Sequence, residues 1–241
     1  MARSAPSPSF EDALGAIRSI DGWLTDDQAR LLFEHASKLR PGSRVVEIGS
    51  FRGRSAIILA KAAPVDAEII AIDPYAGWGA GPEDLEHFNR NLERAGVRDR
   101  VRHIADFSSA AIRDVPPPID LLYIDGAHEF PAARSDISQW GVLVSQGGTM
   151  LIHDAYSSVG VTLAQIVLLF FGSRFRYRGR SRSLVVYRCE PMSAGMRLSN
   201  AIRQAVQLPW FARNVLVKLA LVARARPVAR LLGHEGTVFP Y

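Results

Sequence analysis

The sequence predicts an α/β protein built on a doubly wound, mostly parallel sheet of seven strands, with helical extensions at both ends. Short apolar runs alternate with helix-like stretches through the middle of the chain. With 241 residues, 48 % of them apolar and 22 % charged, the chain is large enough for one substantial core and has an ordinary globular composition.

Five apolar runs have the length expected of strands that are buried on both faces. They are residues 44–49, 68–73, 100–105, 120–125 and 149–154. The intervening patterns predict helices over 55–63, 83–95, 130–144 and 159–171. Right-handed crossovers then give a doubly wound sheet, and the runs 175–179 and 183–188 close it as a C-terminal antiparallel hairpin.

The two ends of the chain differ from this alternation. A Ser- and Pro-rich stretch, 1–9, predicts a flexible leader, and 10–40 predicts a helical segment in which Thr25 or Asp26 caps a helix. The sheet domain is expected over 41–189. Residues 190–241 predict a basic helical extension with pieces near 196–208 and 211–224, divided by Pro209.

The net charge of +5 comes from this extension, which holds seven Lys and Arg against two Asp and Glu. One interpretation is a peripheral membrane helix attracted to anionic lipid. The other, which we favour, is a helix packed on the domain or at a dimer interface. The neutral body and the absence of an RNA-binding module argue against nucleic acid.

Compartment signals are few. Cys189 is the only cysteine, so a disulfide framework is excluded and a reducing cytoplasm is expected. The N-terminus lacks the apolar stretch of a secretory signal, and the longest apolar run, 161–171, is too short to cross a bilayer. We expect a cytoplasmic protein, with membrane association through the tail left open.

The carboxyl ends of the expected strands carry polar residues, and ligands of doubly wound sheets bind beyond those ends. Gly49 and Gly53 follow the first strand and allow a tight backbone turn, with Ser55 placed to cap the next helix. Asp73 ends the second strand, where a carboxylate can accept hydrogen bonds from ribose hydroxyls. The later strands end at Asp106, Asp125 and the pair His153-Asp154.

Other nucleotide sites fit less well. The first loop reads E-I-G-S-F-R-G-R-S, which lacks the first glycine of the dinucleotide pattern G-x-G-x-x-G and has Phe51 and Arg52 at the bend. The sequence also contains no GxxxxGK[ST] phosphate loop. The sequence therefore gives weak support for a dinucleotide site and none for a P-loop site.

The motifs VVEIGSFRGRSAIILA, AIDPYAGWG, LLYIDGAHEF and GGTMLIHDAY occur in this order over about residues 22–189. Together they resemble the Rossmann-like class I S-adenosylmethionine-dependent methyltransferases, and within them the I-D-G-x-H subgroup of bacterial sugar and natural-product O-methyltransferases. The resemblance implies a methyltransferase domain over 41–189 that binds S-adenosylmethionine. It assigns to the cofactor Glu47, Gly49, Ser50, Gly53, Ser55, Asp73, Asp106, Phe107, Ser108 and Asp125.

The resemblance also implies a divalent metal, Mg²⁺ or Mn²⁺, held by Asp125, His153 and Asp154. His153 stands where related metal sites have an acid, and imidazole suits softer ions than Mg²⁺. The histidine could instead orient Asp154 from outside the ligand set.

His128 matches the general base of the family, because methyl transfer to oxygen requires the attacking hydroxyl to lose its proton. The segment 74–84, with Tyr75 and Trp78, is either a lid or an anchored surface loop, and Tyr156 is a weaker candidate for the acceptor pocket.

The sequence thus predicts an O-methyltransferase for a sugar or glycosylated small molecule, acting as a homo-oligomer with the N-terminal helices or the tail as interface. A metal-independent enzyme that uses the histidine alone and a non-catalytic module of the same fold are the alternatives.

Overall fold

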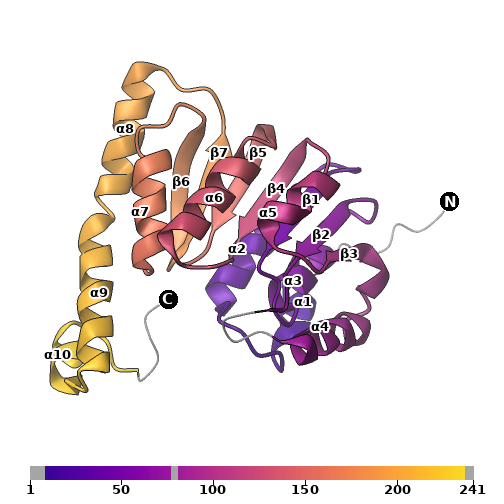
Figure 1. The fold of residues 1–241 in the computed structure, drawn as a ribbon, viewed down its shortest axis with the longest axis horizontal. Coiled ribbons are helices and arrows are strands. Elements are labelled where there is room, and N and C mark those ends of the chain that lie inside the picture. Colours follow the sequence, from indigo (N-terminus) through magenta and orange to yellow (C-terminus); the bar gives the residue numbers. More distant parts are fainter. Residues whose placement is uncertain (1–8, 77–80, 237–241) are drawn as a thin grey trace. The chain divides into compact units, whose positions relative to one another are not determined.

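The computed structural model describes residues 9–76 and 81–236. Its seven strands form one sheet in the order β3-β2-β1-β4-β5-β7-β6 (Figure 1). The pairs β1–β2 and β2–β3 are parallel, whereas β5–β7 and β6–β7 are antiparallel. The predicted fold class, a mostly parallel seven-stranded sheet closed by an antiparallel hairpin, is therefore confirmed.

Contacts divide the chain into two compact units, Met1–Tyr123 and Ile124–Tyr241. The prediction of segments at 1–9, 10–40, 41–189 and 190–241 remains a prediction, and residues 1–8 of the expected leader lie outside the described residues. The elements of unit 1, with the last strand ending at the boundary, are α1 Phe10–Ile17, α2 Asp26–Ala36, β1 Arg44–Ile48, α3 Arg54–Ala62, β2 Glu68–Ile72, α4 Pro82–Arg94, η1 Arg98–Arg100, β3 Val101–Ile104, α5 Ser108–Ala111, η2 Ile112–Asp114 and β4 Ile119–Ile124.

The core of unit 1 forms where apolar strands meet α3. Val46 of β1 is paired with Ile70 of β2, and both side chains are buried. All residues of α3 except Arg54 and Lys61 are buried as well, because α1 and α2 pack against the helix. Thr25 caps α2 in a capping box with Gln28, as one of the two predicted alternatives has it.

Unit 2 holds the second part of the sheet and the C-terminal helices. Its elements are α6 Phe130–Gly141, β5 Val144–Ile152, α7 Val159–Leu168, β6 Phe175–Ser181, β7 Leu184–Cys189, α8 Ala194–Ala205, α9 Leu208–Val222 and α10 Arg226–Leu231. In the hairpin register, Ile152 of β5 lies opposite Val185 of β7, and both are buried. Helix α6 packs on α7, and α8 packs on β6.

A buried polar network fixes α8 to the rest of unit 2. The hydroxyl of Tyr187 on β7 accepts a hydrogen bond from Gln165 on α7 and donates one to Gln204 on α8. Asn200, one turn earlier on α8, accepts a bond from the backbone of Tyr177. Since each of these polar groups is buried, their mutual bonds specify where the helix sits.

Several predicted boundaries are wrong for identifiable reasons. Strand β5 begins at Val144 rather than 149, because the strand includes the polar residues before Thr149 as well as the apolar run. Ser55 does not cap α3: the cap residue is Gly53, and the helix starts at Arg54. Pro209 does not divide the tail helices, because it lies in the first turn of α9, where proline is tolerated.

The stretch Ala194–Val222, which contains α8 and α9, is long and apolar enough to cross a bilayer by length and composition alone. Only 17 % of its most apolar window is buried. Length and composition alone do not show that this stretch spans a membrane, and the expectation that no segment does so stays a prediction.

Candidate functional site

The loop between β1 and α3 in unit 1 depends on two glycines with left-handed backbone angles. Gly49 has φ +86° and Gly53 has φ +83°, values that residues other than glycine adopt only with strain. A Cβ on Gly53 would meet Leu92 Cδ1 of α4 at 2.6 Å. The predicted tight turn is thus present, and α4 leaves no room for a larger residue at its end.

Side chains from three other segments hold this loop in place. Asp73 at the end of β2 accepts the backbone N–H of Phe51 at 2.8 Å. Arg52 donates to Asp84 on α4 at 2.7 Å and also pairs with Asp21 of the α1–α2 connection. Burial raises the pKa of Asp84, but the bonds from Arg52 and the Gly81 N–H outweigh burial and lower that pKa. The loop is therefore fixed before any ligand binds.

Arg54, the first residue of α3, connects the N-terminal helices to the same loop. Its guanidinium donates to the carbonyls of Ile17, Ile20 and Leu24, at 2.7 to 3.1 Å. Burial lowers the pKa of this arginine. The predicted N-terminal helical segment is thus a structural support of the glycine loop.

Unit 1 also presents polar groups suited to a ligand. Glu47 is fully buried on β1, and the buried hydroxyl of Ser50 has no hydrogen-bond partner among the described residues. Ser55, predicted at the cofactor, lies inside α3 and is 5 % exposed.

Three further residues that the sequence assigned to the cofactor follow β3. Asp106 and Phe107 are exposed, and Ser108 begins α5. The structure thus places them at the carboxyl end of β3, as predicted, and their assignment to adenine stays a prediction.

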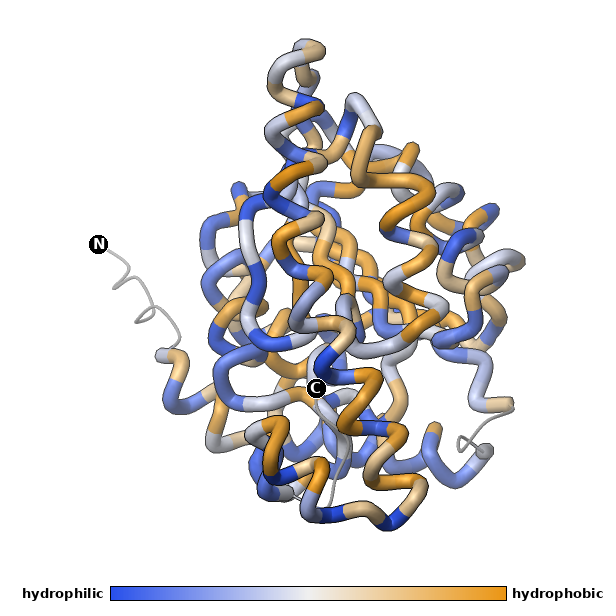
Figure 2. Tube along the Cα trace, turned by 90° about the vertical axis from the view of Figure 1, so that its left-hand side faces the viewer, coloured by the Kyte–Doolittle hydropathy of each residue, from blue (hydrophilic) through white to orange (hydrophobic). Residues whose placement is uncertain are grey.

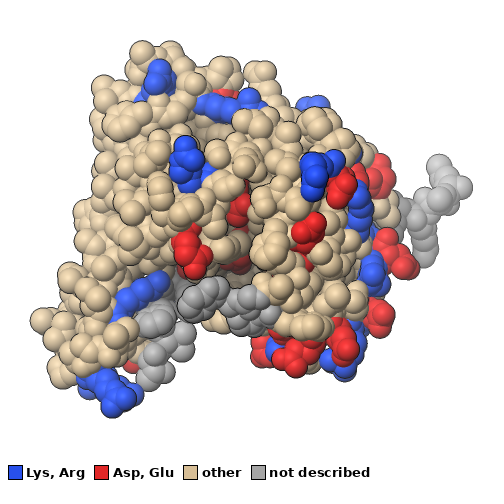
Figure 3. All heavy atoms as spheres, in the orientation of Figure 1, with Lys and Arg blue, Asp and Glu red and all other residues tan. Residues whose placement is uncertain are grey.

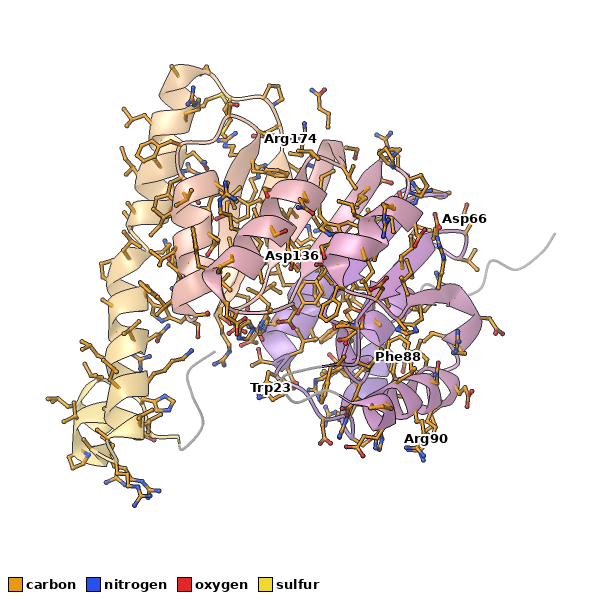
Figure 4. All side chains as sticks on the ribbon, in the orientation of Figure 1. Trp23, Asp66, Phe88, Arg90, Asp136 and Arg174 are labelled. Carbon is orange, nitrogen blue, oxygen red and sulfur yellow. The ribbon has the colours of Figure 1, made fainter. Side chains whose placement is uncertain are left out.

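The segment after Asp73 was predicted as a lid or an anchored loop. Tyr75 is buried, and its ring contacts Phe88 of α4 and His103 of β3, with centroids 6.1 and 5.3 Å away (Figure 4 labels Phe88). Tyr75 is therefore a core anchor, while Trp78 lies outside the described residues.

In unit 2, four predicted site residues come together at the ends of β4 and β5. His153 Nδ1 lies 3.2 Å from Asp125 Oδ1 and 3.2 Å from Asp154 Oδ2. His128 Nε2 lies 2.9 Å from the same oxygen of Asp154. His153 and Asp154 are buried, whereas the His128 side chain is 53 % exposed. We refer to Asp125, His128, His153 and Asp154 as the Asp-His cluster.

The charges of the Asp-His cluster shift each other's titration. The hydrogen bond to Asp154 raises the pKa of His128. Burial alone would lower the pKa of His153, but the carboxylates of Asp125 and Asp154 outweigh it and raise that pKa to about 10. Burial likewise acts to raise the pKa of Asp154, and the two histidines reverse the effect and lower it. The carboxylates of the cluster therefore favour the protonated forms of His128 and His153.

Three residues of the Asp-His cluster have ligand atoms close enough together to hold a metal ion. Asp125, His128 and Asp154 each offer a ligand atom, and the three atoms lie within 4.8 Å of one another. The sequence had expected His153 as the third ligand, but its Nδ1 hydrogen bonds to the two carboxylates. Two carboxylates and one imidazole suit Mn²⁺ or Zn²⁺ better than Mg²⁺. The donor set of Asp125, His128 and Asp154 thus fits a divalent ion, and the role of His153 as a ligand stays a prediction.

The backbone around the Asp-His cluster is held in unusual conformations by α7 and α9. Asp154 has φ +55°, a left-handed conformation that is uncommon for residues other than glycine. Gly160 on α7 packs so closely on the His128 carbonyl that a Cβ would lie 2.2 Å from that oxygen. Asn214 and Lys218 on α9 donate to the carbonyls of Tyr156 and Ser157, at 3.1 and 2.9 Å.

The sequence reasoning missed this role of α9. The available signal was the position of Lys218, well away from the arginines of its helix, together with the polar Asn214 in an apolar stretch. Tyr156, a candidate for the acceptor pocket, is fully buried instead. Cys189 is buried, burial raises the pKa of its thiol, and the expectation of an inert residue fits this environment.

Comparisons with known proteins point to one family. Residues 46–155 match a family model described as a methyltransferase domain. A catechol O-methyltransferase of Mycobacterium tuberculosis is 30 % identical over 126 residues, which cover 51 % of this chain and 52 % of the relative. A protein-L-isoaspartate O-methyltransferase of Hyperthermus butylicus is 32 % identical over 129 residues, covering 51 % and 48 %. The chain thus spans about half the length of these relatives.

The fold has solved counterparts as well. The structure of an O-methyltransferase from Bacillus cereus in complex with SAH superposes with a TM-score of 0.57 at 15 % identity. The superposition covers 75 % of this chain and 87 % of that one. At this level of identity the likeness supports the fold.

Proposed function

The chain carries a class I S-adenosylmethionine-dependent methyltransferase domain, and from this premise we propose that it transfers the methyl group of S-adenosylmethionine to a hydroxyl of a small molecule. The acceptor class we propose is a sugar or a glycosylated compound. The two curated relatives differ in the acceptor that their names give, so the acceptor is left to experiment. The observation that best supports methyl transfer to an oxygen is the 2.9 Å contact between His128 Nε2 and Asp154 Oδ2, because it orients a histidine that can act as a base.

Unit 1 supplies the binding site for the methyl donor in this proposal. The turn at Gly49 and Gly53 brings backbone close to the ligand, and Asp73 keeps lone pairs for ribose hydroxyls beside its bonds to the loop. The Ser50 hydroxyl gains a partner when the donor binds. Glu47, Ser55, Asp106, Phe107 and Ser108 complete the proposed set in unit 1, and Asp125 is the proposed cofactor residue of unit 2.

Unit 2 supplies the proton acceptor. With Nε2–H donated to Asp154, His128 has Nδ1 left to take the proton of the acceptor hydroxyl. The acceptor oxygen then forms its bond to the methyl carbon as the sulfur–methyl bond breaks, and S-adenosylhomocysteine leaves. Asp154 holds the imidazole in the required tautomer and stabilises the imidazolium that forms. His153 in turn orients Asp154 and Asp125.

A second candidate, metal-assisted transfer, is favoured by the close approach of the ligand atoms of Asp125, His128 and Asp154. A bound divalent ion would lower the pKa of the acceptor hydroxyl and hold its oxygen. His128 would then be a ligand and no longer the base. A chelator distinguishes the two mechanisms, because it would stop metal-assisted transfer but not transfer with His128 as the base.

The test is an assay of methyl transfer from radiolabelled S-adenosylmethionine to a panel of sugars, glycosides and catechols. Transfer that persists in EDTA and disappears in His128→Ala, with unchanged affinity for S-adenosylhomocysteine, supports the histidine as base. Loss in EDTA with recovery on adding Mn²⁺ supports the metal. No transfer from a protein that binds the cofactor would leave a binding module as the remaining interpretation.

The compartment is also part of the proposal. A single buried thiol is compatible with the cytoplasm that we expect from cysteine usage.

A further inference from the structure

The outer face of α9 in unit 2 is apolar, which is unusual for a surface helix. Its exposed side chains are those of Pro209, Ala212, Leu216, Leu219 and Val222. They recur every three or four residues and therefore share one face. Leu216, Leu219 and Val222 are 52, 60 and 72 % exposed. An ordinary surface helix would place its charged residues there.

The two cations of α9 lie on the side that faces the protein. Lys218 donates to the Ser157 carbonyl, and its pKa is lowered by burial. Arg213 donates to the carbonyls of Leu232 and Gly233 at the end of α10. The polar groups of α9 thus bind the helix to the rest of unit 2, while the apolar side chains of its outer face are exposed to solvent.

Helix α8 continues the pattern. Leu198, Ile202 and Val206 follow at intervals of four and are 55 to 66 % exposed. Orange apolar segments accordingly recur along α8 and α9 in Figure 2, which views this side. We call the exposed side chains Leu198, Ile202, Val206, Leu216, Leu219 and Val222 the α8–α9 face.

The charged residues in the part of the chain that forms the α8–α9 face are all positive. No Asp or Glu stands between Glu190 and Glu235, and this stretch holds seven Lys and Arg. Among these, Arg197, Arg203, Arg224, Arg226 and Arg230 are exposed. Blue cations lie among tan atoms over this part of the surface in Figure 3. A partner of this face must therefore accept apolar side chains and carry negative charge.

From this combination we propose that the α8–α9 face docks on the surface of a membrane that contains anionic lipid. The apolar side chains enter the boundary of the acyl chains, and the arginines contact the lipid headgroups. A second copy of the chain fits less well, because a two-fold symmetric interface would set the basic surface against itself. The helices lie on the bilayer and do not cross it, because Asn200, Gln204 and Asn214 bind them to unit 2.

The test is flotation of the full chain with vesicles of phosphatidylcholine alone or with about one third phosphatidylglycerol. The wild type is expected to float with the anionic vesicles and to be released by raised salt. The variant Leu216→Ser/Leu219→Ser/Val222→Ser should lose at least about tenfold in vesicle affinity. The variant Arg203→Gln/Arg224→Gln/Arg226→Gln should lose the preference for anionic lipid. Circular dichroism and thermal unfolding establish that each variant is folded.

The matched control is Val65→Ser/Val142→Ser, the same chemical change at two side chains that are exposed elsewhere. It should float like the wild type. A wild type that stays unbound with both vesicle types overturns the proposal, as does equal loss in the control. Light scattering that shows a dimer, broken by the triple serine variant and without vesicle binding, also overturns it, because the face then joins two copies.

Discussion

The glycine loop of unit 1 and the Asp-His cluster of unit 2 are positioned by different physics. The loop owes its shape to left-handed glycines, a close helix, the hydrogen bond that Asp73 accepts and the one that Arg52 donates, which are set once the chain folds. The cluster depends on charges whose balance changes with protonation. We therefore expect sterics to govern the first region, and pH and metal ions to govern the second.

The largest effect is expected from Gly53→Ala. The added Cβ would meet Leu92 and Phe88 in a left-handed conformation, so the variant should lose about 2–4 kcal/mol of unfolding free energy. Urea denaturation measures this loss, and titration with S-adenosylhomocysteine should show weakened binding. Gly15→Ala is the control, because a Cβ there meets nothing within 4 Å and favours helix α1. A Gly53→Ala protein as stable as wild type would show that the loop adapts.

Next in size is Asp154→Asn, which should reduce turnover by about 100-fold while cofactor affinity changes little. Because Asp154 raises the pKa of His128, the wild-type rate should rise with pH through that raised value. In the variant, the rise of the rate with pH should occur at lower pH. Measurement of the rate as a function of pH gives the size of this shift. Glu190→Gln makes the same chemical change elsewhere in unit 2 and should leave the profile alone. A rise at the same pH in the variant would remove Asp154 as the orienting group.

A smaller effect concerns stability against pH. The pKa of His153 is 6.5 when unperturbed and about 10 in the fold. The stability that protonated His153 contributes to the fold is therefore complete below pH 6.5 and is lost as the pH rises toward 10. Unfolding free energy should therefore fall across this window in the wild type and stay flatter in His153→Gln. The Asp84→Asn variant of unit 1 should lose similar stability at both ends of the window, since the lowered pKa of Asp84 lies below it. Equal slopes in wild type and His153→Gln would contradict the cluster electrostatics.

The smallest effect is expected from Asn214→Ala, which removes one hydrogen bond to the backbone after Asp154. We expect turnover to fall about two- to tenfold with unchanged cofactor affinity. Steady-state kinetics and calorimetry measure the two quantities. Arg224→Ala, an exposed change in the same extension, is the comparison, and identical kinetics of both variants would show that α9 does not position the cluster.

Much of the fold could be predicted from the sequence. Continuous apolar runs ending in glycine or a carboxylate marked β1, β2 and β4 to within a residue, because buried strands leave that pattern. Strand β5 was harder, since Ser145 to Gly148 resemble a turn although they continue the strand. Helix α10 was missed because it is short and begins beside Pro227.

The site could be predicted as a set of residues but not as a geometry. Consecutive strand side chains point to opposite faces, so His153 and Asp154 would be expected to separate. In the structure, however, His153 Nδ1 lies 3.2 Å from Asp154 Oδ2, and Asp154 has a left-handed φ that the sequence pattern does not predict. Nor does the sequence pattern predict that the ligand atoms of Asp125, His128 and Asp154 lie within 4.8 Å of one another.

The measurement that tests the account most directly is a calorimetric titration of the purified chain with S-adenosylhomocysteine, repeated on Asp73→Ala and on Asp154→Asn. The account predicts a dissociation constant on the order of 1–100 μM for the wild type, at least about tenfold weaker binding for Asp73→Ala, and nearly wild-type binding for Asp154→Asn. Absence of binding by folded wild-type protein would contradict the assignment of the glycine loop to the methyl donor.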